Sequence, residues 1–337
     1  MACNRFVAFS GFQKRRFFDT LSGMATTSSF TFSYDFSCVK ALALDLDGTL
    51  LRPDNTLGEL TINTLKACRE QGLHLIVCTG RSPEASEKYR AAIGAAGPMV
   101  FFNGAEVTNV DAQGCRSDVI YPSLLRFDVI DFCVDISRKT GVYFQVYFPE
   151  TDGPEGRVGK RPMAERGGAE WDMYAKHTGS PPLVADIKRA LAAAASRAAM
   201  QPDKFGCIKG MFLADPAKLE EIRPLLSEQF GDTVYITKTL DTFLEIMSTG
   251  VSKGTGLTLA LDRLSLASEH VLAFGDEESD LSMFESAGFS IAPANAKNKV
   301  KAAARVVVEA NTEEGAARFL ERTILHVKRS APALQRL

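Results

Sequence analysis

Two carboxylates, Asp45 and Asp47, directly follow the apolar run of residues 41–44 and are themselves followed by Gly48 and Thr49. An extended backbone points side chains two residues apart in the same direction, so both carboxylates share one side. Two acids held together repel each other unless a cation intervenes, and oxygen ligands suit a hard cation such as Mg²⁺. A carboxylate can also act as a nucleophile, and a second one can transfer protons. The pair therefore predicts a magnesium site with a nucleophile beside an acid–base group.

Three further residues with suitable chemistry fall at the ends of predicted elements. Thr79 ends an apolar strand and can hydrogen-bond a phosphoryl oxygen. Lys253 begins a helix, whose N-terminus reinforces the lysine's positive charge beside an anion. Asp276 follows Gly275 at the end of another strand and can hold Mg²⁺ together with Asp45. Phosphoryl transfer through an enzyme-bound intermediate needs a nucleophile, an acid–base group, positive charge and a metal, so the chain holds a candidate for each part.

The elements that must position these residues are apolar strands alternating with helices. Besides the run before Asp45, strands are predicted at residues 73–78, 99–102, 271–274, 290–292 and 305–308. Helices are predicted at residues 61–71, 82–93, 252–264, 281–287, 298–304 and 313–322. This alternation predicts βαβ units and one parallel sheet, an α/β core of the Rossmann-like kind. Ligands bind at the carboxyl edge of such a sheet, where the candidate residues fall.

Between residues 123 and 246 the pattern changes. Helices are predicted at 124–140, 183–200 and 216–230, and strands at 142–148, 208–213, 234–237 and 242–246. Residues 149–169 are rich in Gly, Pro and charge and are predicted to be a loop. The block reads as an α+β domain inserted into the first. We therefore expect a core of residues 39–122 and 247–327 and an inserted domain of residues 123–246.

The first 38 residues differ from the rest, with four basic residues against two acidic ones, ten Ser or Thr and eight Phe. This composition is typical of an organellar transit peptide, and the alternative is an untargeted extension. The protein is accordingly expected in the cytoplasm, or in a plastid or mitochondrion if the segment targets it. Residues 328–337 are expected to form a loose tail.

Length and composition narrow the class of protein. A chain of 337 residues is long for one core and predicts two domains. The net charge of −2 provides no basic field for nucleic acid or a membrane surface, and no apolar stretch approaches a span of about 20 residues. Seven scattered cysteines without a Cys-x-x-Cys pair predict free thiols in a reducing compartment. The expected partner is a small molecule, and the oligomeric state stays open.

The order Asp-x-Asp, Thr-Gly, Lys and Gly-Asp resembles the haloacid dehalogenase (HAD) superfamily of phosphohydrolases from about residue 40 onward. The large insert between the Thr and Lys signals, preceded by Asn103-Gly104-Ala105, resembles its Cof-type branch. So do Leu244-Glu245-Ile246, Val251-Ser252-Lys253-Gly254 and Asn295-Ala296. The resemblance implies Mg²⁺-dependent hydrolysis of a sugar phosphate, nucleotide or vitamin-related phosphate through an aspartyl-phosphate. It also implies that the inserted domain is a cap over the site.

The resemblance further implies roles for individual residues. Asp45 and Asp276 would hold the metal through their carboxylates, and Asp47 through its backbone carbonyl, while Asp280 would support Lys253 or the metal. Asp45, Asp47, Thr79 and Lys253 would be catalytic. The substrate would lie beside Gly80, Arg81, Asn103 and Gly104.

One residue departs from the branch, whose pattern Gly-Asp-x-x-Asn-Asp here has Ser279 in place of Asn. Serine keeps a hydroxyl but loses the reach and the paired donor and acceptor of the amide, so we expect reduced activity. Two alternatives stay open: a phosphomutase or phosphotransferase on the same scaffold, and a weakly active or non-catalytic metabolite-binding protein. Asp47 favours phosphoester chemistry over carbon–halogen cleavage, because the family's carbon–halogen-cleaving members lack an acid there.

Two features of the insert have two interpretations each. The basic residues of the loop at 151–168 either meet an acidic substrate or are simply solvated: Arg157, Lys160, Arg161 and Arg166. Trp171 and the pair Tyr143 and Phe144 are expected in the core of the cap, the alternative being a platform on which a base stacks. The four histidines show no metal-ligand spacing.

Overall fold

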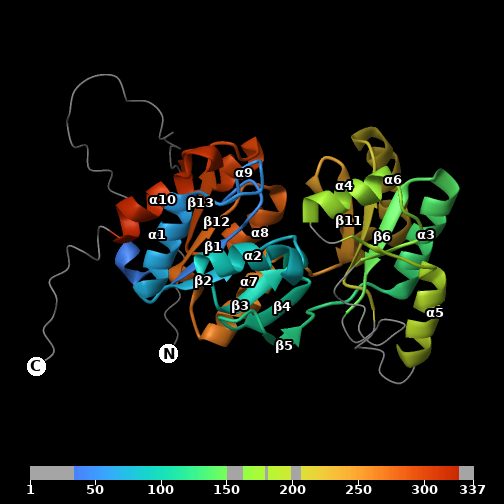
Figure 1. Ribbon diagram of the computed structural model, residues 1–337, viewed down its shortest axis with the longest axis horizontal. Helices are drawn as coiled ribbons and strands as arrows, with labels where there is room; N and C mark the ends of the chain where they lie inside the picture. Colours follow the sequence, from blue (N-terminus) through green and yellow to red (C-terminus); the bar gives the residue numbers. More distant parts are fainter. Residues whose placement is uncertain (1–33, 150–161, 179–180, 199–205, 326–337) are drawn as a thin grey trace, which may run out of the picture.

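The structure is a computed structural model that describes residues 34–149, 162–178, 181–198 and 206–325. Its elements form two groups side by side, a core and a second group that we call the cap (Figure 1). The expectations for most of the N-terminal segment and for the C-terminal tail lie outside the described residues. Within the described part of the chain, no helix has the length and apolarity to cross a membrane.

The core contains a five-stranded, wholly parallel sheet in the order β14-β13-β12-β1-β2. Its strands are β1 (Ala41–Leu44), β2 (His74–Val77), β12 (Val271–Phe274), β13 (Phe289–Pro293) and β14 (Val306–Val308). Every residue of β1 is buried, as an apolar strand covered on both faces requires. The predicted Rossmann-like α/β core is confirmed.

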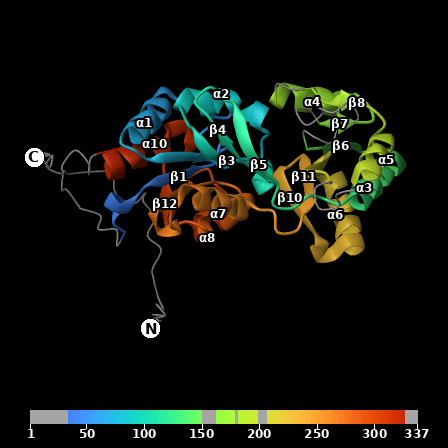
Figure 2. The ribbon, with the colours of Figure 1, turned by 90° about the horizontal axis from the view of Figure 1, so that it is seen from below.

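Helices cover both faces of this sheet (Figure 2). They are α1 (Glu59–Glu70), α2 (Pro83–Ile93), α7 (Lys253–Leu264), α8 (Leu281–Glu285), α9 (Asn298–Ala303) and α10 (Gly315–Leu320). Alternate residues of β1 serve the two faces, since Leu42 packs in the cluster that contains Leu65 of α1, and Ala43 in the one that contains Leu257 of α7. The last helix is shorter than predicted, because the chain passes into a π-helical turn at Glu321–Leu325.

The prediction for residues 99–102 was wrong in its pairing. Strand β3 (Gly97–Phe101) forms a separate antiparallel sheet with β4 (Glu106–Val110) and β5 (Arg116–Ile120). A single parallel bridge, Cys78 with Val100, joins β3 to the end of β2. The chain reverses directly after β3, and β4 then takes the hydrogen-bonding edge of β3 along its whole length.

The cap contains a six-stranded mixed sheet in the order β10-β11-β9-β6-β7-β8. Its strands are β6 (Tyr143–Tyr147), β7 (Met163–Ala164), β8 (Leu183–Val184), β9 (Lys209–Leu213), β10 (Val234–Leu240) and β11 (Phe243–Ser248). Its helices are α3 (Phe127–Thr140), α4 (Ala169–Thr178), α5 (Ile187–Ala198) and α6 (Pro216–Phe230). The predicted inserted α+β block is confirmed as part of the fold.

The two faces of the cap sheet pack against different partners. Val146 and Phe144 lie in an apolar cluster with residues of α3, α5 and α6. Tyr143 and Tyr147, which alternate with them, lie in the same cluster as core residues and Tyr174 of α4. One face of the sheet is therefore covered by three helices, and the other faces α4 and the core.

Two predictions within the cap were wrong. Residues 149–169 are not all loop, since β7 pairs there with β6, although residues 150–161 lie outside the described part. The helix predicted from residue 183 begins at Ile187, because Leu183 and Val184 pair with β7 and the Asp186 carboxylate accepts the Arg189 backbone N–H at the helix start.

The core and the cap are joined by two crossing segments. Their side chains meet where Ser123 and Ser248 lie with hydroxyl oxygens 2.7 Å apart. The chain thus leaves the core and returns to it at one place, and the carboxyl edge of the core sheet faces the cap.

Candidate active site

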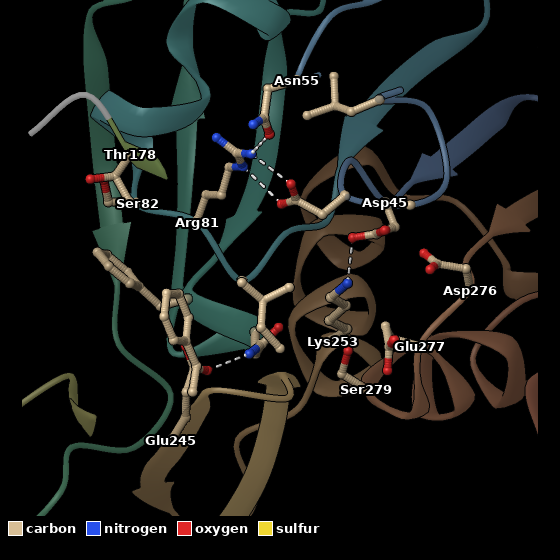
Figure 3. Close-up of a pocket in the computed structure, with 18 of the residues that line it drawn as sticks. Asp45, Asn55, Arg81, Ser82, Thr178, Glu245, Lys253, Asp276, Glu277 and Ser279 are labelled. Carbon is tan, nitrogen blue, oxygen red and sulfur yellow. Dashed lines mark hydrogen bonds and ion pairs between the residues drawn. The ribbon is translucent and has the colours of Figure 1, made fainter. Parts of the chain in front are cut away.

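A lysine and two carboxylates form the buried base of the site. The Lys253 Nζ donates to Asp45 Oδ1 at 2.6 Å (Figure 3). It also donates to Asp280 Oδ1 at 2.6 Å, and all three side chains are almost fully buried. Strand pairing brings them together, because the Asp45 N–H continues the β1–β12 ladder to the Phe274 carbonyl. Ser252 caps α7 through the Thr255 N–H and so places Lys253 in its first turn.

Asp276 completes a cluster of carboxylates after β12. Ligand oxygens of Asp45, Asp276 and Asp280, which we call the carboxylate cluster, all lie within 4.8 Å of one another. The Thr49 hydroxyl donates to Asp276 Oδ1 at 2.7 Å. Gly48 has a φ of +78°, and a Cβ there would lie 2.2 Å from Asp276 Oδ2, so only glycine fits between the two turns. Three acids so close need added positive charge.

The pKa values of Asp45, Asp276 and Lys253 are shifted by burial and by the charges of their neighbours. Burial and, after it, the Asp280 charge raise the pKa of Asp276, the Thr49 hydrogen bond opposes them, and the pKa lies at about 7. Burial also raises the pKa of Asp45 well above its ordinary value, although the Lys253 ammonium opposes the shift. Burial alone would lower the pKa of Lys253, but Asp280 and Asp45 raise it overall, so the ammonium stays charged.

Asp280 organises the loop after β12. It is fully buried, and its Oδ2 accepts the backbone N–H groups of Asp276 and Glu277, each at 2.9 Å. Its other oxygen accepts from Lys253. Each of these contacts holds either the loop that carries Asp276 or the lysine in place, and a role of Asp280 in supporting Lys253 or a metal stays a prediction.

Asp47 is held by an arginine rather than by Lys253. Arg81 binds it through two nitrogens, Nε to Oδ2 at 2.7 Å and Nη2 to Oδ1 at 2.6 Å. The same guanidinium donates to Asn55 Oδ1 at 2.7 Å (Figure 3). Thr79 is fully buried and its hydroxyl accepts the Arg81 N–H, so it lies beneath the arginine. Two-point binding fixes the orientation of the Asp47 carboxylate.

The turn after β3 has three consecutive residues with positive φ: Phe102 at 51°, Asn103 at 56° and Gly104 at 100°. Phenylalanine in this region is strained, and such strain gathers at functional sites. A Cβ at Gly104 would lie 1.9 Å from the Ser252 carbonyl oxygen, so the turn presses against the start of α7. Asn103 Nδ2 donates to Glu245 Oε2 at 2.8 Å, whereas its buried Oδ1 has no hydrogen-bond partner.

The cap contributes an ion pair that we had not predicted. Lys209 of β9 pairs with Glu245 of β11 at 2.5 Å, and its ammonium also donates to the Gly80 carbonyl at 3.3 Å. Both side chains are only 3% exposed. Each is the one charged residue of an otherwise apolar strand. This pattern in the sequence could have identified Lys209 and Glu245 as a buried ion pair, because charged residues are rarely buried unless they are paired.

A cavity of about 640 Å³ lies between the core and the cap. Among its lining residues are eight of the predicted site residues: Asp45, Asp47, Gly80, Arg81, Asn103, Lys253, Asp276 and Ser279. The other three, Thr79, Gly104 and Asp280, lie behind this wall and do not line it. From the cap come Tyr147, Tyr174, Thr178, Lys209, Met211, Leu240, Phe243 and Glu245.

The remaining predictions for residues of the cap have different outcomes. Arg157, Lys160 and Arg161 lie outside the described residues, while Arg166 donates to the Gly141 carbonyl and does not line the cavity. Tyr143 and Phe144 are buried in the cap, as predicted. Trp171 packs partly buried and donates to the Pro182 carbonyl. The six cysteines in the described ranges are free thiols, as predicted.

Comparison with known proteins assigns the family. Residues 42–154 and 175–320 match the model of the family described as haloacid dehalogenase-like hydrolase. This match covers most of the chain, which therefore belongs to that family.

The relatives are enzymes of similar length. A 5-amino-6-(5-phospho-D-ribitylamino)uracil phosphatase of Bacillus subtilis is 28% identical, with 83% of this chain and 96% of the relative covered. A pyridoxal phosphate phosphatase of Escherichia coli is 26% identical over 83% of this chain and 97% of the relative. The crystal structure of TM0651 from Thermotoga maritima superposes with a TM-score of 0.67 at 26% identity, with 84% of this chain and 97% of that one covered. The predicted resemblance and the prediction of a phosphatase are confirmed.

Proposed function

We propose that this phosphatase uses Mg²⁺ and forms a phosphoenzyme on Asp45. The observation that carries the proposal is the Lys253 ammonium, held between Asp45 and Asp280 at the base of a cavity and next to Asp276. A nucleophile, fixed positive charge and a set of hard oxygen ligands thereby meet at one end of a space large enough for a small metabolite.

The residues support a two-step reaction. An Asp45 carboxylate oxygen attacks phosphorus, and the bond from phosphorus to the leaving oxygen breaks while Asp47 gives that oxygen a proton. Asp47 then takes a proton from water, the water oxygen attacks phosphorus, and Asp45 and inorganic phosphate are released. Lys253 stabilises the negative charge that develops on the phosphoryl oxygens, and Arg81 orients Asp47 throughout.

The residues present fit a magnesium ion. The carboxylate cluster offers only oxygen ligands, and the raised pKa of Asp276 shows a local shortage of positive charge. Asp45 and Asp276 would hold the ion through carboxylates and Asp47 through its backbone carbonyl. Bound there, Mg²⁺ would polarise the phosphoryl oxygens and offset the charge of the acids. Ser279 lines the cavity beside this cluster, where we propose that it supports less activity than asparagine would.

The substrate is proposed to be a small phosphorylated metabolite bound beside Gly80, Arg81 and Asn103, while Gly104, which does not line the cavity, lies against the start of α7. By their names, the two relatives described above act on 5-amino-6-(5-phospho-D-ribitylamino)uracil and on pyridoxal phosphate. Neither nucleic acid nor a membrane is a proposed partner, in keeping with the net charge of −2.

The first experiment is phosphate release from sugar phosphates, nucleotides, pyridoxal phosphate and flavin-pathway phosphates, with Mg²⁺ and with EDTA. We expect metal-dependent release. Asp45→Asn should abolish both release and acid-stable labelling of the protein by phosphate, whereas the exposed control Asp232→Asn should keep both. Full activity of Asp45→Asn would refute the proposal. Product analysis decides the alternative function, because a mutase yields an isomeric sugar phosphate and no free phosphate.

Two further proposals rest on sequence. We keep the division into a core of residues 39–122 and 247–327 and a cap of residues 123–246. Residues 1–38 are proposed to be a transit peptide or an untargeted extension, and the fluorescence of a reporter fused to these residues decides between an organelle and the cytoplasm.

A further inference from the structure

We propose that the leaving group bound by this site carries a planar aromatic ring, held against a row of aromatic side chains, three from the cap and one from the core. We call Phe102, Tyr147, Tyr174 and Phe243 the aromatic wall. This inference rests on the proposed phosphatase function and names the class of substrate: a phosphate ester of an alcohol that carries an aromatic or heteroaromatic ring.

The aromatic wall is continuous. The rings of Phe102 and Tyr147 lie edge to face with centroids 5.5 Å apart, and those of Tyr174 and Phe243 have centroids 6.4 Å apart. The Tyr147 and Tyr174 hydroxyl oxygens, 2.5 Å apart, join the two pairs. All four line the cavity, together with Met211 and Leu240. Aromatic side chains bind other rings by stacking and edge contacts.

The polar atoms of the wall are already satisfied by one another. The Tyr147 hydroxyl receives the Gln145 amide N–H, and it hydrogen-bonds the Tyr174 hydroxyl. Burial raises the pKa of Tyr174 to about 12, so this phenol stays neutral. Against the four rings themselves a sugar would find few hydrogen-bond partners for its hydroxyl groups, whereas polar residues such as Asn55 and Ser82 line other parts of the cavity. A ring needs no such partners, and the wall offers it carbon surface.

The charged residues beside the wall are also occupied. Lys209 and Glu245 pair with each other, and the Lys209 ammonium lies 4.9 Å from the Tyr147 ring centroid and 5.6 Å from that of Phe102. The buried Asn103 Oδ1 is an acceptor without a hydrogen-bond partner. Since Asn103 lines the cavity, a hydrogen-bond donor on the substrate ring can satisfy it. We therefore expect a ring that carries an N–H or O–H group.

The wall lies where a leaving group must lie. Figure 3 shows Thr178 and Glu245 on the opposite side of the cavity from Asp45 and Asp276. Tyr174 is on the same helix as Thr178, and Phe243 is on the same strand as Glu245. A phosphoryl group over Asp45 thus has the aromatic wall on its far side, which is the direction in which the bond to the leaving oxygen points in an in-line attack.

The test compares matched esters in the wild-type protein with Mg²⁺. Pyridoxal 5′-phosphate and flavin mononucleotide are set against ribose 5-phosphate and glucose 6-phosphate. Stacking contributes about 1–3 kcal/mol per ring, so we expect kcat/KM to favour one of the aromatic esters by about 10- to 100-fold. Phosphate release with equal or higher kcat/KM for the sugar phosphates overturns this inference and leaves the proposed function standing.

A variant pair assigns the preference to the wall. Phe243→Leu keeps an apolar side chain of similar size and removes the ring, so we expect the aromatic-to-sugar ratio of kcat/KM to fall about 10-fold. Tyr235→Leu removes a ring of the cap that does not line the cavity, and the ratio should not change. An unchanged ratio in folded Phe243→Leu protein contradicts the role of the wall.

A binding measurement separates the two hypotheses. The chain has one tryptophan, Trp171, which lies three residues before Tyr174 on α4. In Asp45→Asn protein we expect pyridoxal 5′-phosphate to quench its fluorescence saturably and ribose 5-phosphate to compete at least 10-fold more weakly. If no ester released phosphate in the wild-type protein, the proposed function would fail, and this titration would still decide the ring preference.

Discussion

Replacing Lys253 with methionine tests the electrostatic reading of the site. The change keeps a long apolar stem and removes the one ammonium that contacts Asp45 and Asp280. Each contact of 2.6 Å corresponds to about 6 kcal/mol of direct attraction at an effective dielectric constant near 20. Desolvation of the ammonium offsets much of this sum.

The net effect of Lys253→Met on stability depends on the carboxylates that lose their ion-pair partner. Removing one partner of a buried pair costs about 3–5 kcal/mol, because an uncompensated charge remains. Here three carboxylates within 4.8 Å of one another would lose their neighbouring cation. We expect Lys253→Met to lower the free energy of unfolding by about 3–5 kcal/mol and to abolish phosphate release, since loss of one transition-state donor costs about 100- to 1,000-fold.

The assay is urea unfolding in EDTA, followed by far-ultraviolet circular dichroism. The control is Lys299→Met, whose exposed pair with Glu278 is worth no more than about 1 kcal/mol. The double variant Lys253→Met/Asp280→Asn removes the orphaned charge while an amide oxygen remains to accept the backbone N–H groups. It should therefore be more stable than Lys253→Met alone. A double variant that is as unstable as the sum of two independent losses would refute the reasoning.

Three further predictions address the other parts of the site. Gly48→Ala places a Cβ 2.2 Å from Asp276 Oδ2 and so displaces this carboxylate. The Mg²⁺ concentration that half-activates phosphate release should therefore rise about 10- to 100-fold. An unchanged concentration would contradict a metal role for Asp276. Because the Asp276 pKa is raised to about 7, protons compete with Mg²⁺ for this carboxylate below that pH. The apparent Mg²⁺ affinity should therefore rise about tenfold per pH unit up to pH 7 and level off above it. An affinity that does not change from pH 5.5 to 8 would show that no such proton is displaced. Arg81→Ala removes the two hydrogen bonds that orient Asp47, so kcat for an alkyl phosphate should fall about 100-fold. The kcat for 4-nitrophenyl phosphate should fall less than tenfold, because its leaving group needs no proton. Equal losses would mean that Arg81 does not act through Asp47.

The parallel core was predictable because its strands are short continuous apolar runs, which occur in sheets covered on both faces. Asp45 and Asp276 could be located for the same reason, since each follows such a run and neighbouring parallel strands end at one edge. Lys253 was predictable from its place at a helix start after Ser252. These signals are local in the sequence, and the fold brings them together by one rule of sheet geometry.

What could not be predicted depends on pairings between distant segments. Strand β5 (Arg116–Ile120) has no buried residue and little apolar pattern, so only its pairing with β4 defines it as a strand. Asn55 was missed because its contact with Arg81 is set by the path of a turn. Tyr174 lines the cavity from α4, and this helix was missed because its apolar periodicity is weak. The first residue of α4 also lies in the segment that we had expected to be a loop.

The place of β1 in the sheet has a consequence for how the protein is made. This strand lies between β2, which follows about 30 residues later, and β12, which follows only after the whole cap. During synthesis one edge of a fully apolar strand therefore stays open until Val271 has left the ribosome, and open apolar edges are sites of misassociation. Asp45 and Lys253, 208 residues apart, cannot meet before Lys253 has left the ribosome. A growing chain thus carries Asp45, the proposed nucleophile, long before it carries the ammonium that pairs with it.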